Sequence, residues 1–163
     1  VYDFLKIILP HLPNHADWQI LIAGEGADRD KIKKLISNNG QIQMLGVVKD
    51  KNDFFSRISV LVYPSRVAES VGVAALEAQA YGVPVIATKI GALAEIIDHG
   101  KTGFLVEKDK SEQWATCLET LESDQDLYNG ISRNSRLAAQ NFSEAKMFQR
   151  FDRLISAPGR DQN

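Results

Sequence analysis

Two acidic residues in the middle of the chain are the strongest candidates for chemistry. Glu69 and Glu77 lie eight positions apart in a stretch of small and apolar residues, and Glu77 is the only formally charged residue between Glu69 and Lys89. A carboxylate that is buried without a partner is costly, so it is normally neutralised or paired. We therefore expect Glu77 either to meet a donor from a distant part of the fold or to bind the hydroxyls of a ligand.

The residues between these acids suit an anion. Glu69 should precede a helix whose first turn exposes backbone N–H groups, those of Ser70, Val71, Gly72 and Val73. Phosphate groups bind at such helix ends, and Gly72 would let a ligand approach closely. Ionised carboxylates accept hydrogen bonds from sugar hydroxyls, so the stretch fits a phosphate between two hydroxyl-bearing rings, as in a nucleotide-sugar. The alternative is that Glu69 caps a neighbouring loop and Glu77 meets a backbone donor.

Strands and helices alternate around these acids. Short apolar runs predict strands at residues 18–23, 42–48, 59–63, 83–88 and 104–106. Helical spacing of apolar residues predicts helices at residues 1–10, 28–36, 50–58, 92–98, 111–121 and 125–140, and from Ser143 onward. This alternation predicts an α/β fold with helices on both faces of a parallel sheet. Because ligands bind at the carboxyl ends of such strands, the loops that follow the first four strands should converge on one crevice.

Size and composition limit the classes of function. The chain has 163 residues, which fits one domain at residues 1–156 and a disordered tail at residues 157–163. A net charge of −2 and scattered basic residues give no electrostatic basis for binding nucleic acid. No apolar run is long enough to span a membrane, and the single cysteine, Cys117, fits a cytoplasmic protein.

Other kinds of site have weaker support. Gly24-Glu25-Gly26 follows a predicted strand, as in a dinucleotide-binding loop, but Arg29 stands where close helix packing needs Gly or Ala. A tight turn explains these glycines better. The histidines His11, His15 and His99 lie in predicted loops without metal-ligand spacing. We therefore predict no metal site and no redox cofactor.

The motifs around the two acids form a longer ordered pattern. It comprises Pro64-Ser65, the pair Glu69 and Glu77, residues 77–88, and the stretch from Gly91 to Val106. This pattern resembles the retaining glycosyltransferases of the GT4 type, whose signature is an E-x7-E motif. The similarity covers essentially the whole chain and implies a Rossmann-like domain, the donor-binding C-terminal half of the two-domain GT-B fold.

The resemblance implies a role for each matching position. Glu69 would be the catalytic carboxylate, binding the hydroxyls of the donor sugar near the anomeric centre. The helix-end amides would hold sugar or diphosphate oxygens, namely those of Ser70, Val71, Gly72 and Val73. Glu77 would bind the ribose hydroxyls, and Gly46 with Val47 would lie near the nucleobase. Ser70 and Val71 depart from the Gly or Pro and the bulky residue that the family often has there, which leaves the sugar open.

The resemblance also implies what the whole enzyme does. It would transfer a hexose from a UDP- or GDP-linked sugar to an acceptor with retention of configuration, without a metal, in the cytoplasm or peripherally at a membrane. The acceptor would bind the family's N-terminal domain. In the family, the first strand of this domain carries an Arg and is followed by a Lys-Gly, and these basic residues clamp the diphosphate. That strand would precede Val1. It would lie in the middle of the sheet, because the family's strand order is 3-2-1-4-5-6. We therefore expect the 163-residue chain alone to be inactive. The alternatives are a catalytically silent sugar-nucleotide-binding module and an epimerase of the GT-B fold.

Overall fold

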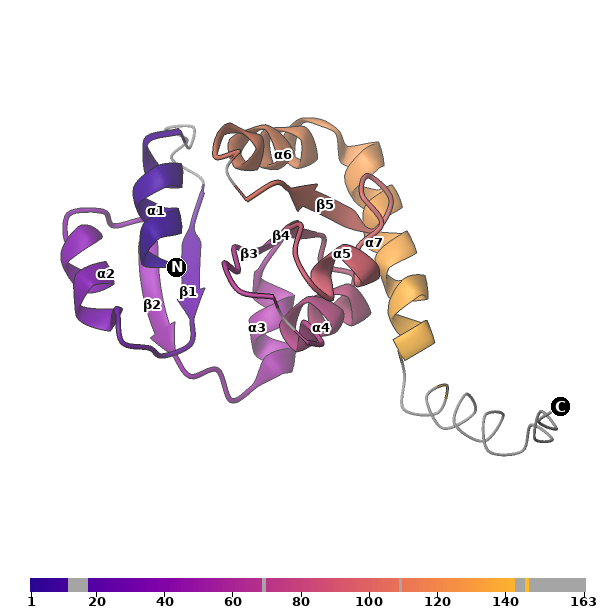
Figure 1. Cartoon of the computed structure of the whole chain (residues 1–163), viewed down its shortest axis with the longest axis horizontal. Helices are drawn as coiled ribbons and strands as arrows, with labels where there is room; N and C mark the ends of the chain where they lie inside the picture. The colour runs from indigo at the N-terminus through magenta and orange to yellow at the C-terminus, as the bar shows by residue number, and fades with distance from the viewer. Residues whose placement is uncertain (12–17, 69, 109, 143–145, 147–163) are drawn as a thin grey trace, which may run out of the picture.

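The computed structural model of the chain describes residues 1–11, 18–68, 70–108, 110–142 and 146. Helices and strands alternate in the predicted order (Figure 1). The strands are β1 (Ile20–Ala23), β2 (Ile42–Gly46), β3 (Leu61–Tyr63), β4 (Val85–Thr88) and β5 (Gly103–Val106). The helices are α1 (Tyr2–Ile8), η1 (Leu9–His11), α2 (Arg29–Leu35), α3 (Lys51–Arg57), α4 (Val73–Tyr81), α5 (Leu93–Ile96), α6 (Glu112–Ser123), α7 (Gln125–Ala139) and η2 (Gln140–Phe142). Apart from residue 146, the predicted final helix and the tail lie outside the described residues.

All five strands are parallel, and they form two sheets. β1 pairs with β2, with Ile20 opposite Ile42, whereas β3, β4 and β5 pair in that order, with Val85 opposite Leu61 and Gly103. β1 and β3 are therefore edge strands, and they lie toward each other in the view of Figure 1. The predicted α/β class is confirmed. The sheet is divided between β1 and β3, which is where the resemblance places one further strand.

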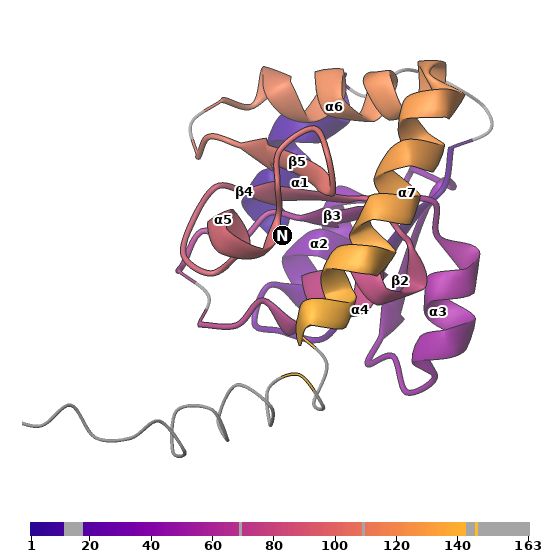
Figure 2. The same ribbon diagram turned by 90° about the vertical axis from the view of Figure 1, so that its right-hand side faces the viewer.

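β4 is the centre of the larger sheet, and its alternating side chains supply two cores. Val85 and Ala87 pack with residues of α3, α4 and α5, whereas Ile86 packs on the other side with Trp114 of α6 and Ile131 of α7. Val85, Ile86 and Ala87 are each 0% exposed. Figure 2 shows α6 and α4 on opposite sides of these strands. Both faces are therefore covered, as a parallel sheet requires.

The smaller sheet has a core of its own, which α1 connects to the larger one. Ile22 of β1 and Ile42 of β2 pack against Ile32 of α2 and Leu5 of α1. The next turn of α1 contributes Ile8 to the core around Ile86. α1 thus joins the two sheets, because Leu5 and Ile8 lie on the same apolar face of the helix and pack into the cores of different sheets.

Candidate functional site

Two loops at the carboxyl ends of the smaller sheet are joined directly. The backbone N–H of Gly24 donates to the carbonyl of Gly46 at 2.7 Å. The Glu25 carboxylate, which pairs with Arg29 at 2.9 Å, covers Gly46 so closely that a Cβ there would lie 2.9 Å from its Oε1. Gly46 has φ 69°, a conformation that favours glycine, and Val47 beside it is 65% exposed. The predicted nucleobase positions therefore form an open loop whose shape depends on Gly46.

Helix α4 begins at a glycine instead of at a polar cap. Gly72 is the N-cap residue with φ 65° and ψ 44°, and no side chain caps the helix. Gly72 is buried, and a Cβ there would lie 3.0 Å from Leu93 Cδ2 and 3.2 Å from Ile96 Cδ1. α5 therefore fills the side of Gly72 on which a Cβ would lie, and the close approach of a ligand to its backbone stays a prediction. The glycine is needed for the left-handed turn and for this packing.

The residues around Gly72 leave the start of α4 accessible. Ser70 is exposed, and the side chains of Val71 and Val73 are 51% and 54% exposed. The carbonyl of Gly72 accepts from the third and fourth amides of the helix, whereas the first-turn amides before them have no acceptor within it. The predicted anion-binding amides thus lie at an open helix end. Glu69 lies outside the described residues, and its role stays a prediction.

Glu77 has a partner from a distant part of the chain. Lys51 Nζ donates to Glu77 Oε1, and the two side chains are 53% and 30% exposed. The first of the two expectations for Glu77, a distant donor, is thus met, while the expectation of a deeply buried carboxylate is wrong. Its partner comes from the first residue of α3, which packs beside α4. One carboxylate oxygen of Glu77 is paired, and the other makes no hydrogen bond to a described residue.

The interface between α3 and α4 fixes this pair. The Tyr81 hydroxyl donates to Asn52 Oδ1, and the Tyr81 ring stacks on Phe55 with centroids 4.9 Å apart. At the same helix start, the Asp50 carboxylate accepts from the backbone N–H of Asp53 at 3.0 Å. Lys51 is not among the site residues predicted from the sequence. A signal was available, because a cation in the first turn of a helix opposes the helix dipole and suggests another partner.

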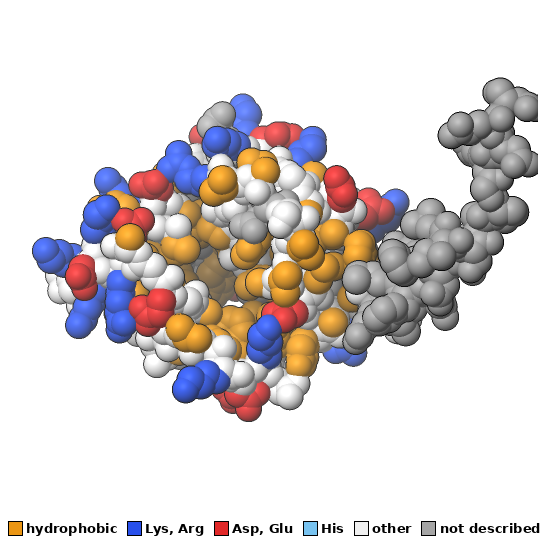
Figure 3. All heavy atoms as spheres, turned by 60° about the horizontal axis from the view of Figure 1, so that its bottom comes forward, with side chains coloured by type: hydrophobic (Ala, Val, Ile, Leu, Met, Phe, Trp, Pro, Cys, Tyr) orange, Lys and Arg blue, Asp and Glu red, His pale blue; other side chains and the backbone are white. Residues whose placement is uncertain are grey.

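Figure 3 shows the face onto which the carboxyl ends of β1 and β2 open. Its centre is hollowed and lined by hydrophobic side chains, and acidic and basic side chains lie around the rim. Exposed valines lie in the loops that follow β2 and β3, namely Val47, Val67 and Val71, and a further one, Val73, begins α4. The hollow and the open start of α4 are features of the end of the fold where a parallel sheet binds its ligands.

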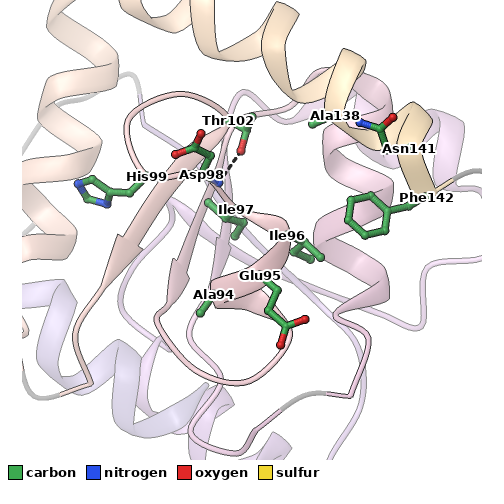
Figure 4. Close-up of a pocket in the computed structure, with 10 residues that line it drawn as sticks. All are labelled: Ala94, Glu95, Ile96, Ile97, Asp98, His99, Thr102, Ala138, Asn141 and Phe142. Atoms are coloured by element: carbon green, nitrogen blue, oxygen red, sulfur yellow. Dashed lines mark hydrogen bonds between the residues drawn. The ribbon is translucent and has the colours of Figure 1, made fainter. Parts of the chain in front are cut away.

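A second pocket lies at the opposite end of the larger sheet, near the start of β5. It has a volume of about 490 Å³ and is lined by α5, the turn before β5, and the end of α7 with η2 (Figure 4). Its charged lining residues are Glu95 and Asp98, with no Lys or Arg. Asp98 pairs with Lys101 at 3.0 Å beside the pocket, and the lining itself carries no basic side chain, so the pocket offers a phosphate little attraction. We therefore place the candidate site at the carboxyl ends of the strands.

Of the three histidines, the structure describes the side chain of His99, which has structural partners. His99 Nδ1 accepts from the backbone N–H of Leu105 at 3.0 Å, and its ring meets Phe104 edge-on. Within the described ranges, no three His, Cys, Asp or Glu side chains are grouped so that they could hold a metal ion. None of the described helices has the length and apolar character needed to cross a membrane.

Comparison with known proteins gives one consistent family. Residues 2–138 match the family described as glycosyl transferases group 1. The chain is 38% identical over 133 residues to a D-inositol 3-phosphate glycosyltransferase of Arthrobacter sp., covering 77% of this chain and 31% of that protein. It is 30% identical over 122 residues to the capsular polysaccharide biosynthesis glycosyltransferase CapM of Staphylococcus aureus, covering 74% of this chain and 32% of that one.

Solved structures agree with this assignment. The C-terminal domain of a group 1 glycosyl transferase, LpcC of Francisella tularensis, is 31% identical with a TM-score of 0.71, over 86% of this chain and 77% of that one. Anabaena HepE in complex with UDP and glucose shares the fold, with 24% identity and a TM-score of 0.82, over 96% of this chain and 44% of that one. The chain therefore belongs to the glycosyl transferases group 1 family and has the fold of the GT-B glycosyltransferases.

Proposed function

We propose that this chain binds the nucleoside-diphosphate sugar donor of a retaining hexosyltransferase of the GT4 type. The chain spans about a third of the length of the Arthrobacter and Staphylococcus relatives. The acceptor would bind to an N-terminal domain of the full-length enzyme, so the complete reaction needs more than these residues. The donor base would be uracil or guanine, and the HepE complex with UDP supports a uridine nucleotide as the first probe.

The observation that supports the proposal best is the position of Glu77 on the helix whose start is open. α4 offers its first-turn amides and its positive dipole end to a diphosphate. Glu77 lies one turn further along the same helix and keeps one carboxylate oxygen available. An ionised carboxylate is acceptor-only, which suits the two ribose hydroxyls of a nucleotide.

The proposed reaction needs stabilisation of the leaving diphosphate more than it needs covalent chemistry. As the bond from the anomeric carbon to the diphosphate oxygen breaks, the amides of residues 70–73 would stabilise the developing negative charge. The acceptor hydroxyl would attack from the face that the diphosphate leaves and would give its proton to the departing diphosphate oxygen, which retains the configuration. Glu69 would hold the sugar hydroxyls and position the anomeric centre. No metal is required in this scheme.

Titration calorimetry of the full-length protein with UDP- and GDP-sugars tests the proposal. We expect Glu77→Ala to weaken binding of the preferred donor by about tenfold or more, because hydrogen bonds to a charged group contribute roughly 1.5–3 kcal/mol. The matched control is Glu119→Ala, which removes an exposed carboxylate from α6, on the other side of the larger sheet from α4. Equal affinities for the wild type and Glu77→Ala would remove Glu77 from the site.

Turnover separates the proposal from the alternative of a silent binding module. The full-length enzyme should release UDP or GDP when donor and acceptor are both present. Donor binding without turnover for any acceptor would favour the silent module. The 163-residue chain alone should show no transfer, because it spans only about a third of the length of the relatives that it matches.

A further inference from the structure

We infer that Lys51 is a positioning residue, which fixes the carboxylate of Glu77 for the ribose hydroxyls of the donor. This inference rests on the proposed function. Lys51 Nζ donates to Oε1 of Glu77, while Oε2 makes no hydrogen bond to a described residue. The pair therefore presents one carboxylate oxygen in a defined direction and leaves it free to accept from a ligand.

The backbone that carries Lys51 is itself held in place. Asp50 caps the first turn of α3 through the N–H of Asp53. Asn52 and Phe55 bind Tyr81, which lies one turn beyond Glu77 on α4. Lys51 and Glu77 thus lie on two helices whose relative position is fixed by a hydrogen bond and an aromatic stack. A lysine on such a support can direct its partner more accurately than a lysine on a loop.

Local stability does not explain why a lysine occupies this position. A cation in the first turn of a helix interacts unfavourably with the positive end of the helix dipole. An ion pair as exposed as Lys51 with Glu77 adds little to the stability of a fold. Lys51 therefore adds little to the stability of α3 or of the fold, and its main effect is on the Glu77 carboxylate that it contacts.

Two consequences for a nucleotide follow from this contact. Fixing the Glu77 side chain before the ligand arrives reduces the entropy that binding would otherwise cost. The positive charge of Lys51 also offsets the negative charge of Glu77, which would otherwise repel a diphosphate at the start of the same helix. Lys51 should therefore increase the preference for nucleotides that carry ribose hydroxyls, without touching the base.

Calorimetry with UDP and 2′,3′-dideoxy-UDP tests this inference on the full-length protein. The dideoxy nucleotide lacks both hydroxyls that Glu77 would bind. We expect Lys51→Met to weaken UDP binding by about fivefold and dideoxy-UDP binding by less, because only the unpaired charge of Glu77 acts on the dideoxy nucleotide, so the ratio of the two affinities falls. Lys51→Arg should restore most of that ratio. The double variant Lys51→Met/Glu77→Gln should bind UDP no more weakly than Glu77→Gln alone, because Lys51 acts through Glu77.

The control is Lys101→Met, which removes a lysine from an exposed ion pair with Asp98, next to the second pocket. It should leave both affinities unchanged. If Glu77→Gln lowers the affinity ratio and Lys51→Met leaves it at the wild-type value, the inference about Lys51 is overturned and the proposed function stands. If the wild type binds neither UDP-linked nor GDP-linked donors, the proposed function is overturned, and the inference with it.

Discussion

The two sheets contain strands of similar sequence, yet these strands are buried to very different extents. The run Ile20–Ala23 of β1 and the run Val85–Thr88 of β4 are both short, apolar and followed by a glycine or a polar loop. All four residues of β4 are buried, whereas in β1 only Ile22 is, at 9% exposed. The place of a strand in its sheet, and not its composition, decides this difference. β4 has a paired neighbour on each side, and β1 has one.

The difference divides the candidate site into a rigid part and a less supported part. α4, with its open start and Glu77, packs on the fully buried strand β4 and is held at its other end by Arg136, whose guanidinium donates to the Tyr81 carbonyl at 3.0 Å. The loop of Gly46 and Val47 follows the smaller sheet. We therefore expect the phosphate and ribose contacts to be preformed and the contacts around the base to adapt to the ligand.

The largest expected effect is that of truncating the centre of the larger sheet. Ile86→Ala should lower the free energy of unfolding by about 4 kcal/mol, because Ile86 is fully buried and a cavity there cannot reach solvent. Urea unfolding followed by circular dichroism measures the change. The milder variant Ile86→Val should cost about 1 kcal/mol. If Ile86→Ala lowered the free energy of unfolding by less than the value expected for Ile86→Val, β4 would not be the rigid centre of the fold.

The corresponding substitution in the smaller sheet should cost less. Ile22→Ala should lower the free energy of unfolding by about 2 kcal/mol, since the edge strand β1 can relax toward the space that is vacated. The same urea experiment compares the two sheets directly. Equal losses of unfolding free energy for Ile22→Ala and Ile86→Ala would contradict the difference between the two sheets, and a smaller loss for Ile22→Ala would support it.

The smallest expected effect is on the reactivity of the Cys117 thiol, which packs next to the larger sheet. Cys117 of α6 packs against the core around Ile86, and burial raises the pKa of its thiol. Less thiolate is therefore present at pH 8 than in an unfolded chain, and alkylation by iodoacetamide should be severalfold slower in the folded protein. The unfolded state releases this proton first, so the contribution of Cys117 to stability should decrease as the pH rises through the ordinary range of a thiol. Alkylation as fast in the folded protein as in urea would contradict this prediction.

Much of the fold could be predicted because local patterns determine it. Apolar runs and helical spacing located every described strand and α-helix. For α4 the sequence predicts the glycine that ends the helix, Gly82, but it places the first turn at residues 70–73, whereas the helix begins at Val73. The pairing of Lys51 with Glu77 could not be predicted, since it joins residues 26 positions apart through the packing of two helices. The burial of Gly72 could not be predicted either, because it depends on packing against α5, which follows later in the chain, after β4.

The division between β1 and β3 has a consequence for handling the protein. Each of these edge strands presents backbone donors and acceptors that pair with no strand among the described residues. Such edges are templates for strands from other molecules, so association of this chain in solution should depend on concentration. The edges are short, four residues in β1 and three in β3, which limits each contact and keeps the association reversible on dilution. Ligand-binding measurements on this chain are therefore best made at low protein concentration, where such association is weakest.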